Sequence, residues 1–476
     1  MSIGTEEATS YDFLVLGGGS AGYAAARTAV GLGLRTAVVD GSEELGGLCI
    51  LRGCMPSKAL IESANRALTV RRSKEFGVDA EMTWMDGQAI IHRKRSLIAE
   101  FADYRRGQLE GGTFDLIRGT ARFLDAYRVE ARLREGGEER VIGFRTCLIA
   151  TGSEISIPEV DGLDEAGFWT SDTVLDSASV PGSLIVLGGG AIALEMAHYL
   201  EALGTQVTVI QRGDQLLRGM DTDVAEAVAD AFRKRGLTIH CGTQLGRVER
   251  NAEDDVRVTF QWQGRQQTVV AEEVLVALGR KPAVDRLGLA EAGVETEKGG
   301  VAVLPTQQTS QPHIFAAGDV CGPLEVVHLA IQQGEMAARN AAAWMGGEKP
   351  REKMDYRLAL FGVFTHPQAA QVGLTEAAAA QEGRAVRVAR YPFADHGKAM
   401  VMGETDGFVK MIADAQTGEI IGASVVGPEA VELIHPVVVA MHFRCTAQEF
   451  LKIPLYHPTL SEIWSYPAEE LAEGKG

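Results

Sequence analysis

A glycine-rich turn between an apolar strand and an alanine-rich helix occurs twice in the chain, and this repeat constrains the fold more than any other feature. In the first copy, strand 12–16 runs into GGGSAG at 17–22, helix 23–32 follows, and strand 35–39 ends at Asp40. Such a turn lets a pyrophosphate approach the backbone at a helix N-terminus, and the acid accepts hydrogen bonds from a ribose diol. The first copy therefore predicts a dinucleotide site with these binding residues: Gly17, Gly19, Ser20, Gly22 and Asp40.

The second copy begins 171 residues after the first. Strand 183–187 precedes GGGAIA at 188–193, a helix is expected over 194–203, and strand 206–210 ends at Gln211. In each copy, 23 positions separate the first glycine from the residue that ends the second strand. Two unlike dinucleotides bound in one chain indicate a flavoprotein that exchanges hydride with a nicotinamide. The second site is expected to use Gly188, Gly190 and Ala193.

Turns that follow other expected strands supply further candidate cofactor contacts. Residues 60–110 are typical of long helices, and 114–150 alternate like short antiparallel strands. Apolar strands end just before turns at three places, and the expected cofactor-binding residues there are Thr151, Gly152, Gly279, Arg280, Gly318 and Asp319.

The last quarter of the chain has a different pattern. From about residue 354, strands are expected at 361–365, 407–412 and 420–426, followed by a helix over 430–443 and a short tail. This pattern predicts an α+β domain.

Charge and hydropathy exclude two classes of partner. The chain has 64 Asp and Glu residues against 46 Lys and Arg residues, a net charge of −18, which disfavours nucleic-acid binding. No apolar run approaches the roughly 18–20 residues of a membrane helix. The N-terminus is polar and acidic, unlike a secretory signal or a transit peptide. We therefore expect a cytoplasmic protein without a nucleic-acid or membrane partner.

Two of the six cysteines lie close together in GGLCILRGCMPSK at 46–58. In a regular helix, residues five apart have Cα atoms roughly 8–9 Å apart, whereas a disulfide needs about 5.5–6 Å. A bridge between Cys49 and Cys54 therefore requires an irregular turn, which Gly53 and Pro56 would permit. We interpret the pair as redox-active. The alternatives are two buried thiols or half of a zinc site, although the neighbouring sequence supplies no further ligands and no metal is expected.

The motif HPTLSE near the C-terminus contains His457 and Glu462. A histidine whose second nitrogen is held by a carboxylate is a general acid–base pair. A purely structural pair is the alternative, and the redox cysteines favour the catalytic interpretation.

In their order and spacing, these motifs resemble the class I flavoprotein disulfide reductases, which include lipoamide dehydrogenase, glutathione reductase and mercuric reductase. The resemblance covers essentially the whole chain. It implies an α/β fold with two Rossmann-like dinucleotide-binding domains and a C-terminal α+β dimerisation domain, in an obligate homodimer. The implied domains are an FAD-binding domain at 1–155, an NAD(P)-binding domain at 156–281, a central domain at 282–352 that completes the FAD site, and an interface domain at 353–476.

The resemblance also implies roles for the candidate residues. Cys54 is expected to be the flavin-facing thiol that forms a charge-transfer complex, and Cys49 the interchange thiol that attacks the substrate. His457 is expected to arrive from the partner subunit as the acid–base group, with Glu462 orienting it.

Four other positions match residues that this family places around its cofactors. Lys58 and Glu195 resemble the ion pair beside the flavin and the nicotinamide. Gly47 and Asp319 resemble residues that contact FAD.

The sequence does not single out one member of the family. Mercuric reductases and large thioredoxin reductases carry an additional cysteine pair near the C-terminus, and this sequence has none there. Soluble transhydrogenases lack a complete redox cysteine pair, whereas this sequence has both Cys49 and Cys54. Ser20 and Arg27 match positions of glutathione reductase, but Glu335 stands where that enzyme has a glutathione-binding arginine, and Ala191 departs from its aromatic gate. Leu460 within HPTLSE resembles lipoamide dehydrogenase.

The second dinucleotide fold favours NADPH over NADH. Gln211 stands where an NAD-binding fold has its ribose-binding acid, and Arg212 and Arg218 follow at the positions that bind a 2′-phosphate in glutathione reductase-like enzymes. In the alternative interpretation they are solvated arginines beside Asp214 and Asp221.

The expected function is an FAD-dependent NAD(P)H oxidoreductase, with NADPH favoured. It passes electrons through Cys49 and Cys54 between the nicotinamide cofactor and a disulfide, a dithiol or another small acceptor. The alternatives are an NAD-dependent dihydrolipoamide dehydrogenase and a reductase of mercuric or other metal ions. A non-enzymatic scaffold subunit has no support in the sequence.

Overall fold

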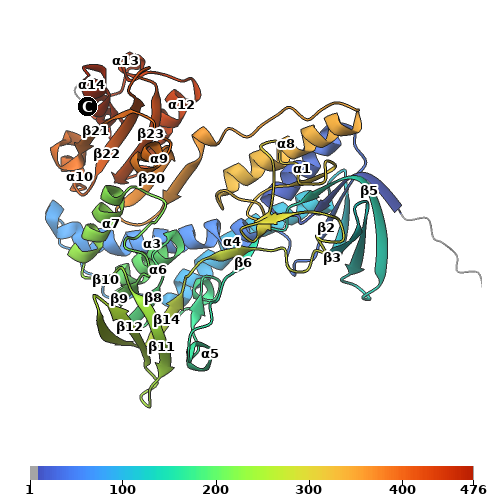
Figure 1. Cartoon of the computed structure of the whole chain (residues 1–476). Coiled ribbons are helices and arrows are strands. Elements are labelled where there is room, and N and C mark those ends of the chain that lie inside the picture. The colour runs from blue at the N-terminus through green and yellow to red at the C-terminus, as the bar shows by residue number, and fades with distance from the viewer. Residues whose placement is uncertain (1–8, 475–476) are drawn as a thin grey trace, which may run out of the picture. The chain divides into compact units, whose positions relative to one another are not determined.

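The computed structural model describes residues 9–474 and divides into two units (Figure 1). The first unit combines the chain up to Pro56 with Lys94–Ser156 and Arg280–Met354. The second combines Ser57–Arg93 and Ile157–Gly279 with the chain from Asp355 onward. The four domains expected from the sequence do not map one-to-one onto these units, since residues 57–93 of the expected FAD-binding domain belong to the second unit.

The first unit is built on a mixed sheet. Its parallel part has the order β3-β2-β1-β5-β18, and β4 joins β3 to β5 as an antiparallel meander. Strand β1 is buried on both faces, as parallel strands are when layers cover both sides of a sheet. The strands are β1 (Thr9–Leu16), β2 (Thr36–Asp40), β3 (Asp115–Asp125), β4 (Arg128–Leu133), β5 (Glu139–Ile149), β6 (Ser153–Ile155), β15 (Arg280–Pro282), β16 (Thr296–Glu297), β17 (Gly300–Val301) and β18 (Ile314–Ala316).

Helices α1 (Ser20–Gly31) and α8 (Val327–Met345) lie side by side in this unit (Figure 1). They approach closely because Gly334 has no side chain: a Cβ there would lie 2.3 Å from the carbonyl oxygen of Ala21. Alanines of both helices pack with Phe13, Val15 and Phe315 of the sheet in one buried cluster. The start of α1 is thereby fixed at the ends of the strands, where the first glycine turn lies.

The second unit contains a parallel sheet of the order β10-β9-β8-β14-β7 and an antiparallel sheet of the order β19-β20-β23-β22-β21. The unit also contains a three-stranded antiparallel sheet of the order β11-β12-β13. The strands are β7 (Trp169–Thr170), β8 (Ser183–Leu187), β9 (Gln206–Ile210), β10 (Thr238–His240), β11 (Gln244–Arg250), β12 (Val256–Trp262), β13 (Arg265–Ala271), β14 (Glu273–Val276), β19 (Leu360–Val363), β20 (Gln368–Gly373), β21 (Val386–Pro392), β22 (Phe408–Asp414) and β23 (Ile420–Gly427).

The second unit also contains several helices. They are α5 (Leu163–Ala166), α6 (Ala191–Ala202), α7 (Thr222–Lys234), α9 (Glu376–Gln381), α10 (Gly397–Met402), α11 (Ala430–Leu433), α12 (His435–His442), α13 (Ala447–Phe450) and α14 (Ser465–Ala472). The long helices α3 (Cys54–Arg72) and α4 (Gly87–Glu110) contribute residues to both units.

The observed elements confirm the expected α/β class, and strands 183–187 and 206–210 coincide with β8 and β9. The expected helix 430–443 is interrupted at Ile434, because Pro436 has no N–H for an intrahelical bond. The expected short tail is wrong: it contains α13 and α14 and packs through Trp464, which is fully buried. Within residues 9–474, no helix is both long enough and apolar enough to cross a bilayer.

Candidate active site

The first glycine turn is closed so tightly that two of its glycines cannot be replaced without displacing backbone. Gly17 has φ +103°, and a Cβ there would lie 2.5 Å from the carbonyl oxygen of Ala150. A Cβ on Gly22 would lie 1.8 Å from the carbonyl oxygen of Gly17. Gly19 precedes the first residue of α1, Ser20, so the unpaired N–H groups of the helix start face the turn. This cradle fits a pyrophosphate.

The carboxylate of Asp40 is fixed at this turn. Its Oδ2 accepts a hydrogen bond of 2.7 Å from the backbone N–H of Gly18, and its Oδ1 accepts one of 2.9 Å from that of Ser42. The hydroxyl of Ser42 also contacts Oδ1. The acid that ends β2 is therefore oriented beside the glycine turn, where it could accept hydrogen bonds from the ribose of a dinucleotide.

The cysteine segment packs directly onto the same turn. Gly47 has φ +77°, and a Cβ on it would lie 2.8 Å from Cα of Gly19. Cys49 lies in α2 (Leu48–Leu51), and Cys54 is the first residue of α3. The helix is interrupted between them because the chain folds back at Gly53, where a Cβ would lie 3.1 Å from the carbonyl oxygen of Leu48. An irregular turn, which a bridge would require, is thus present, and both cysteines are half-buried.

Arg105 of α4 is a cation near Cys49 that was not among the residues expected from the sequence. Its guanidinium lies 4.2 Å from the ring centroid of Tyr23. Burial lowers the pKa of Arg105, while the charges of Tyr23 and Cys49 act in the opposite direction. A nearby cation favours the thiolate over the thiol. The i, i+1 pair Arg105-Arg106 in a charged helix gives no sequence signal for this role.

Asp319 belongs to a hydrogen-bonded chain in the first unit. Arg280 donates from Nε to Oγ of Ser153 at 2.8 Å, and that hydroxyl donates to Oδ2 of Asp319 at 2.7 Å. Burial and the charge of Asp319 raise the pKa of Glu325 nearby. Arg280 thus acts through Ser153 on the acid that the sequence predicts beside FAD.

The neighbouring turns hold this chain in place. Gly318 has φ +81°, and its N–H donates to Oε1 of Gln333 at 2.7 Å. Thr151 donates from its hydroxyl to the carbonyl of Ala283 at 2.9 Å, and Gly152 has φ +73°. These residues surround the same strand ends as the first glycine turn, since Gly17 packs against Ala150 and Thr151.

The second glycine turn repeats the first in its geometry. Gly188 has φ +121°, and a Cβ there would lie 2.3 Å from the carbonyl oxygen of Ala277. Gly190 precedes α6, and Ala193 is fully buried. Gly279, in the turn that follows strand β14, has φ +124°. The cradle for a second dinucleotide is therefore present in the second unit.

Gln211 takes the place that Asp40 has in the first turn. Its side chain lies over Gly189, where a Cβ would be 3.0 Å from Cδ of Gln211. Arg212 and Arg218 are exposed, and neither has an ion-pair partner in the described part of the chain. Asp221 is buried and bonded to Lys410, so it does not pair with these arginines at the surface.

Lys58 and Glu195 form an ion pair in the second unit. Nζ of Lys58 lies 3.0 and 2.9 Å from the two carboxylate oxygens of Glu195. The backbone N–H of Phe364 donates to the same carboxylate at 3.1 Å, and the ammonium lies 4.5 Å from the ring centroid of Phe364. The buried carboxylate therefore fixes the position of a partly exposed ammonium.

His457 and Glu462 are paired as the motif predicted. Nδ1 of His457 lies 2.9 Å from Oε2 and 3.1 Å from Oε1 of Glu462. The imidazole side chain is 81% exposed on this chain, whereas that of Glu462 is 15% exposed. The carboxylate holds the ring in one orientation while the rest of the ring is accessible to a second molecule.

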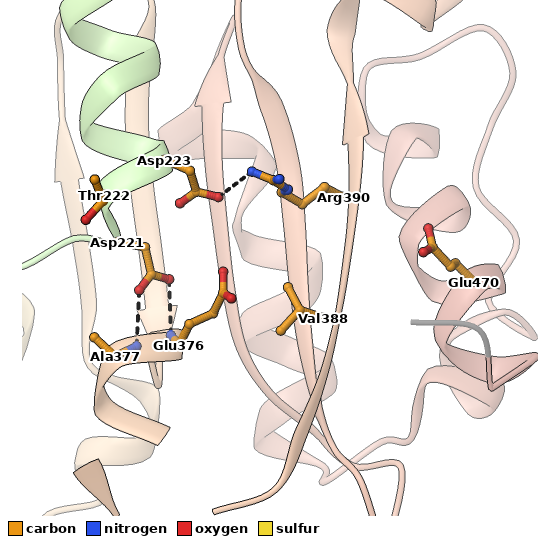
Figure 2. A pocket seen from close by; sticks show the side chains of 8 residues that line it. All are labelled: Asp221, Thr222, Asp223, Glu376, Ala377, Val388, Arg390 and Glu470. Atoms are coloured by element: carbon orange, nitrogen blue, oxygen red, sulfur yellow. Dashed lines mark hydrogen bonds and ion pairs between the residues drawn. The ribbon is translucent and has the colours of Figure 1, made fainter. Parts of the chain in front are cut away.

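A pocket of about 700 Å³ in the second unit is lined by a different set of residues. Figure 2 shows the carboxylates of Asp221, Asp223 and Glu376 in its wall, with Arg390 reaching Asp223 at 2.7 Å. These three carboxylates could surround a metal ion. Nζ of the fully buried Lys410 bonds all three instead, at 2.7 to 2.8 Å, so an ammonium already supplies the cluster with a cation.

Two family models match the chain: "Pyridine nucleotide-disulphide oxidoreductase" over residues 11–334, and the dimerisation domain of the same name over residues 361–468. Proteins named dihydrolipoyl dehydrogenase are similar over nearly their whole length. That of Bacillus subtilis is 34% identical over 96% of both chains, and that of Chlorobaculum tepidum is 35% identical over 98% of both.

Solved structures show the same similarity. LpdA from Mycobacterium tuberculosis matches with a TM-score of 0.86 at 29% identity, over 97% of this chain and 99% of that one. The HOCl-induced flavoprotein disulfide reductase RclA from Escherichia coli, solved as a Cu(II) complex, matches with a TM-score of 0.83 at 26% identity, over the same shares.

Proposed function

Because the chain belongs to the pyridine nucleotide-disulphide oxidoreductase family, we propose that it uses Cys49 and Cys54 to reduce a small disulfide with electrons from NADPH. The observation that carries this proposal is the interrupted helix between the two cysteines, packed on the first glycine turn through Gly47. The residues of the first turn, with Asp40 and Asp319, fit FAD. Bound FAD supplies the two-electron link between the nicotinamide and the cysteine pair.

In the proposed reaction, Cys49 attacks as the thiolate, with Arg105 stabilising its charge. Sγ of Cys49 attacks one sulfur of the substrate disulfide, the S–S bond breaks, and the first product leaves as a thiolate that takes a proton from His457. The thiolate of Cys54 then attacks Sγ of Cys49. The mixed disulfide breaks, a Cys49–Cys54 disulfide forms, and the second product leaves as a thiol after protonation.

The protein is a homodimer, as the dimerisation domain indicates. In the proposed arrangement His457 serves the cysteine pair of the partner subunit, and Glu462 holds Nδ1 so that Nε2 exchanges the proton. The exposure of His457 on the single chain supports this arrangement. We place the reaction in the cytoplasm, since reduced thiols persist in a reducing compartment.

NADPH is proposed as the coenzyme because of the second turn. Gln211 stands where an NAD-binding fold has a carboxylate, so no negative charge there repels a 2′-phosphate. Arg212 and Arg218 are exposed cations with unused hydrogen-bonding groups. Lys58, held by Glu195, is proposed to lie beside the flavin and the nicotinamide.

A second candidate is NAD-dependent dihydrolipoamide dehydrogenase. The names of the similar proteins and the Leu460 of HPTLSE favour it. Reduction of a metal ion is the third, since the similar reductase RclA was solved as a complex with Cu(II).

A turnover panel separates these candidates. The holoenzyme is assayed with lipoamide, glutathione disulfide, other small disulfides, Cu(II) and Hg(II), each with NADPH and with NADH. We expect disulfide turnover with NADPH, and its loss in Cys49→Ser and Cys54→Ser. Cys49→Ser should keep a long-wavelength absorbance from the remaining thiolate beside the flavin, whereas Cys54→Ser should lose it. Full disulfide turnover by Cys49→Ser would refute the assigned roles.

A further inference from the structure

His396 is a buried histidine whose side chain is not accounted for by the fold. Its backbone is satisfied, because its N–H donates to the carbonyl of Phe393 and its carbonyl accepts from Met400, both at 3.0 Å. The side chain is fully buried, and neither ring nitrogen has a hydrogen-bond partner within residues 9–474. A buried polar group without a partner costs free energy, so such a group in a folded protein calls for a reason.

The ring of His396 is directed toward the acid–base pair. Its Nε2 lies 3.6 Å from Oε1 of Glu462. The rings of Phe393 and Tyr466 confine it edge-on, with centroids 6.5 and 6.4 Å away. A separation of 3.6 Å is a few tenths of an ångström longer than a hydrogen bond, and a small rotation of the Glu462 side chain would close it.

Glu462 has acceptor capacity to spare. Nδ1 of His457 lies within reach of both carboxylate oxygens, but it has one N–H to donate, whereas a carboxylate accepts about four hydrogen bonds. The Glu462 side chain is 15% exposed, so water reaches it poorly. A second donor from the protein is therefore the natural complement to this carboxylate, and His396 is the buried group that lies beside it.

We propose that His396 is a positioning residue for the acid–base pair: it donates from Nε2 to Glu462 and fixes the orientation of that carboxylate, which in turn orients the imidazole of His457. The proposal rests on the proposed role of His457 and extends it to a residue that touches neither substrate nor cofactor. A neutral imidazole with its proton on Nε2 is the form required.

The surroundings of His396 favour the neutral form. Burial lowers its pKa, the charge of His457 lowers it further, and only Glu462 raises it. Another titratable group that faces this ring is Tyr466, whose own ring is stacked on that of Tyr391 at 3.9 Å, and Asp395 precedes His396 in the chain. Burial raises the pKa of Tyr391, so it stays neutral. A neutral donor forms a hydrogen bond with the carboxylate but does not cancel the negative charge that faces His457.

The test compares donors and non-donors at this position. His396→Phe keeps a ring but removes the donor, and His396→Leu does the same with a smaller side chain if the first variant folds poorly. His396→Gln places an amide N–H near the position of Nε2 and cannot ionise. His240→Phe is the matched control, since His240 lies against Phe260 and Trp262, away from the acid–base pair. Unfolding temperature and the pH profile of kcat are measured for each holoenzyme.

We expect His396→Phe and His396→Leu to lower kcat about threefold to tenfold, because a hydrogen bond to a charged group is lost, with KM unchanged. The pH profile of kcat should shift by about half a unit in both variants, because the acid–base pair then loses a hydrogen bond to its charged form. His396→Gln and His240→Phe should keep the profile of the unmodified enzyme.

Two results would overturn the proposal. One is an unchanged profile in folded His396→Phe; the other is a His396→Gln profile that matches His396→Phe, which would show that the ring only fills space. His457→Ala, assayed in parallel, tests the proposed function separately: if it retains full turnover, the role of His457 is wrong whatever His396 does.

Discussion

At the residue scale, the arginine that follows Gln211 is expected to decide coenzyme choice. Arg212→Ala should lower kcat/KM for NADPH by roughly tenfold or more, because a charge-assisted hydrogen bond to phosphate contributes about 1.5–3 kcal/mol. The value for NADH should be nearly unchanged. Arg233→Ala is the control, since this exposed arginine is paired with Asp230 instead. An unmodified enzyme that prefers NADH, or an Arg212→Ala variant whose kcat/KM for NADPH is unchanged, would contradict the NADPH proposal.

Arg105 is expected to control the reactivity of Cys49. Its guanidinium is held against Tyr23 and interacts with the charge of the Cys49 thiolate. Arg105→Met keeps the length of the side chain without its charge, so the thiolate should be less populated at neutral pH. In NADPH-reduced enzyme, alkylation of Cys49 by iodoacetamide should slow about threefold or more. Arg106→Met, one position along on the exposed side of α4, should leave the rate unchanged.

At the element scale, the start of α1 depends on one glycine. Gly22→Ala would place a methyl group 1.8 Å from the carbonyl oxygen of Gly17, so helix and turn must separate. We expect a protein with little bound flavin, measured by the ratio of flavin to protein absorbance. Gly31→Ala, in the same helix, meets no atom within 4 Å and should bind flavin normally. Full flavin content in Gly22→Ala would show that the turn relaxes.

The ammonium of Lys410 joins β22 to the starts of α7 and α9 through three carboxylates. Lys410→Met leaves these carboxylates without their buried counter-charge, which should lower the free energy of unfolding by about 3–5 kcal/mol. Lys234→Met removes an exposed ion pair with Asp406 and should cost about 1 kcal/mol or less. Urea unfolding of both variants measures the difference. Equal losses would mean that Lys410 contributes no more than a surface lysine.

At the scale of the whole molecule, function should require two subunits. Helix α12 exposes Val439, Phe443 follows one turn later and is also exposed, and His457 is accessible on the single chain. A one-to-one mixture of His457→Ala and Cys49→Ser chains should form heterodimers that each contain one intact site. Since half of random dimers are heterodimers, the mixture should recover about a quarter of the unmodified activity. No recovery after confirmed subunit exchange would place His457 on its own subunit's cysteines.

Short-range pattern was enough to predict the two dinucleotide folds. Each glycine turn depends on backbone geometry within a few residues, so the positions of Gly17 and Gly188 could be predicted from the local sequence. The pairing of His457 with Glu462 also lies within one short segment. The broken helix between Cys49 and Cys54 followed from disulfide geometry and from Gly53.

Which distant charges meet could be learned only from the packed chain. Lys410 and Asp221 are 189 positions apart, and nothing in either segment indicates that an ammonium fills the acidic cluster. His396 and Arg105 lie in segments without a motif, and their relation to Glu462 and Cys49 depends on how separate elements pack. Burial gives these polar groups their effect, because desolvation strengthens each contact, and burial is a property of the packed chain rather than of any short stretch of it.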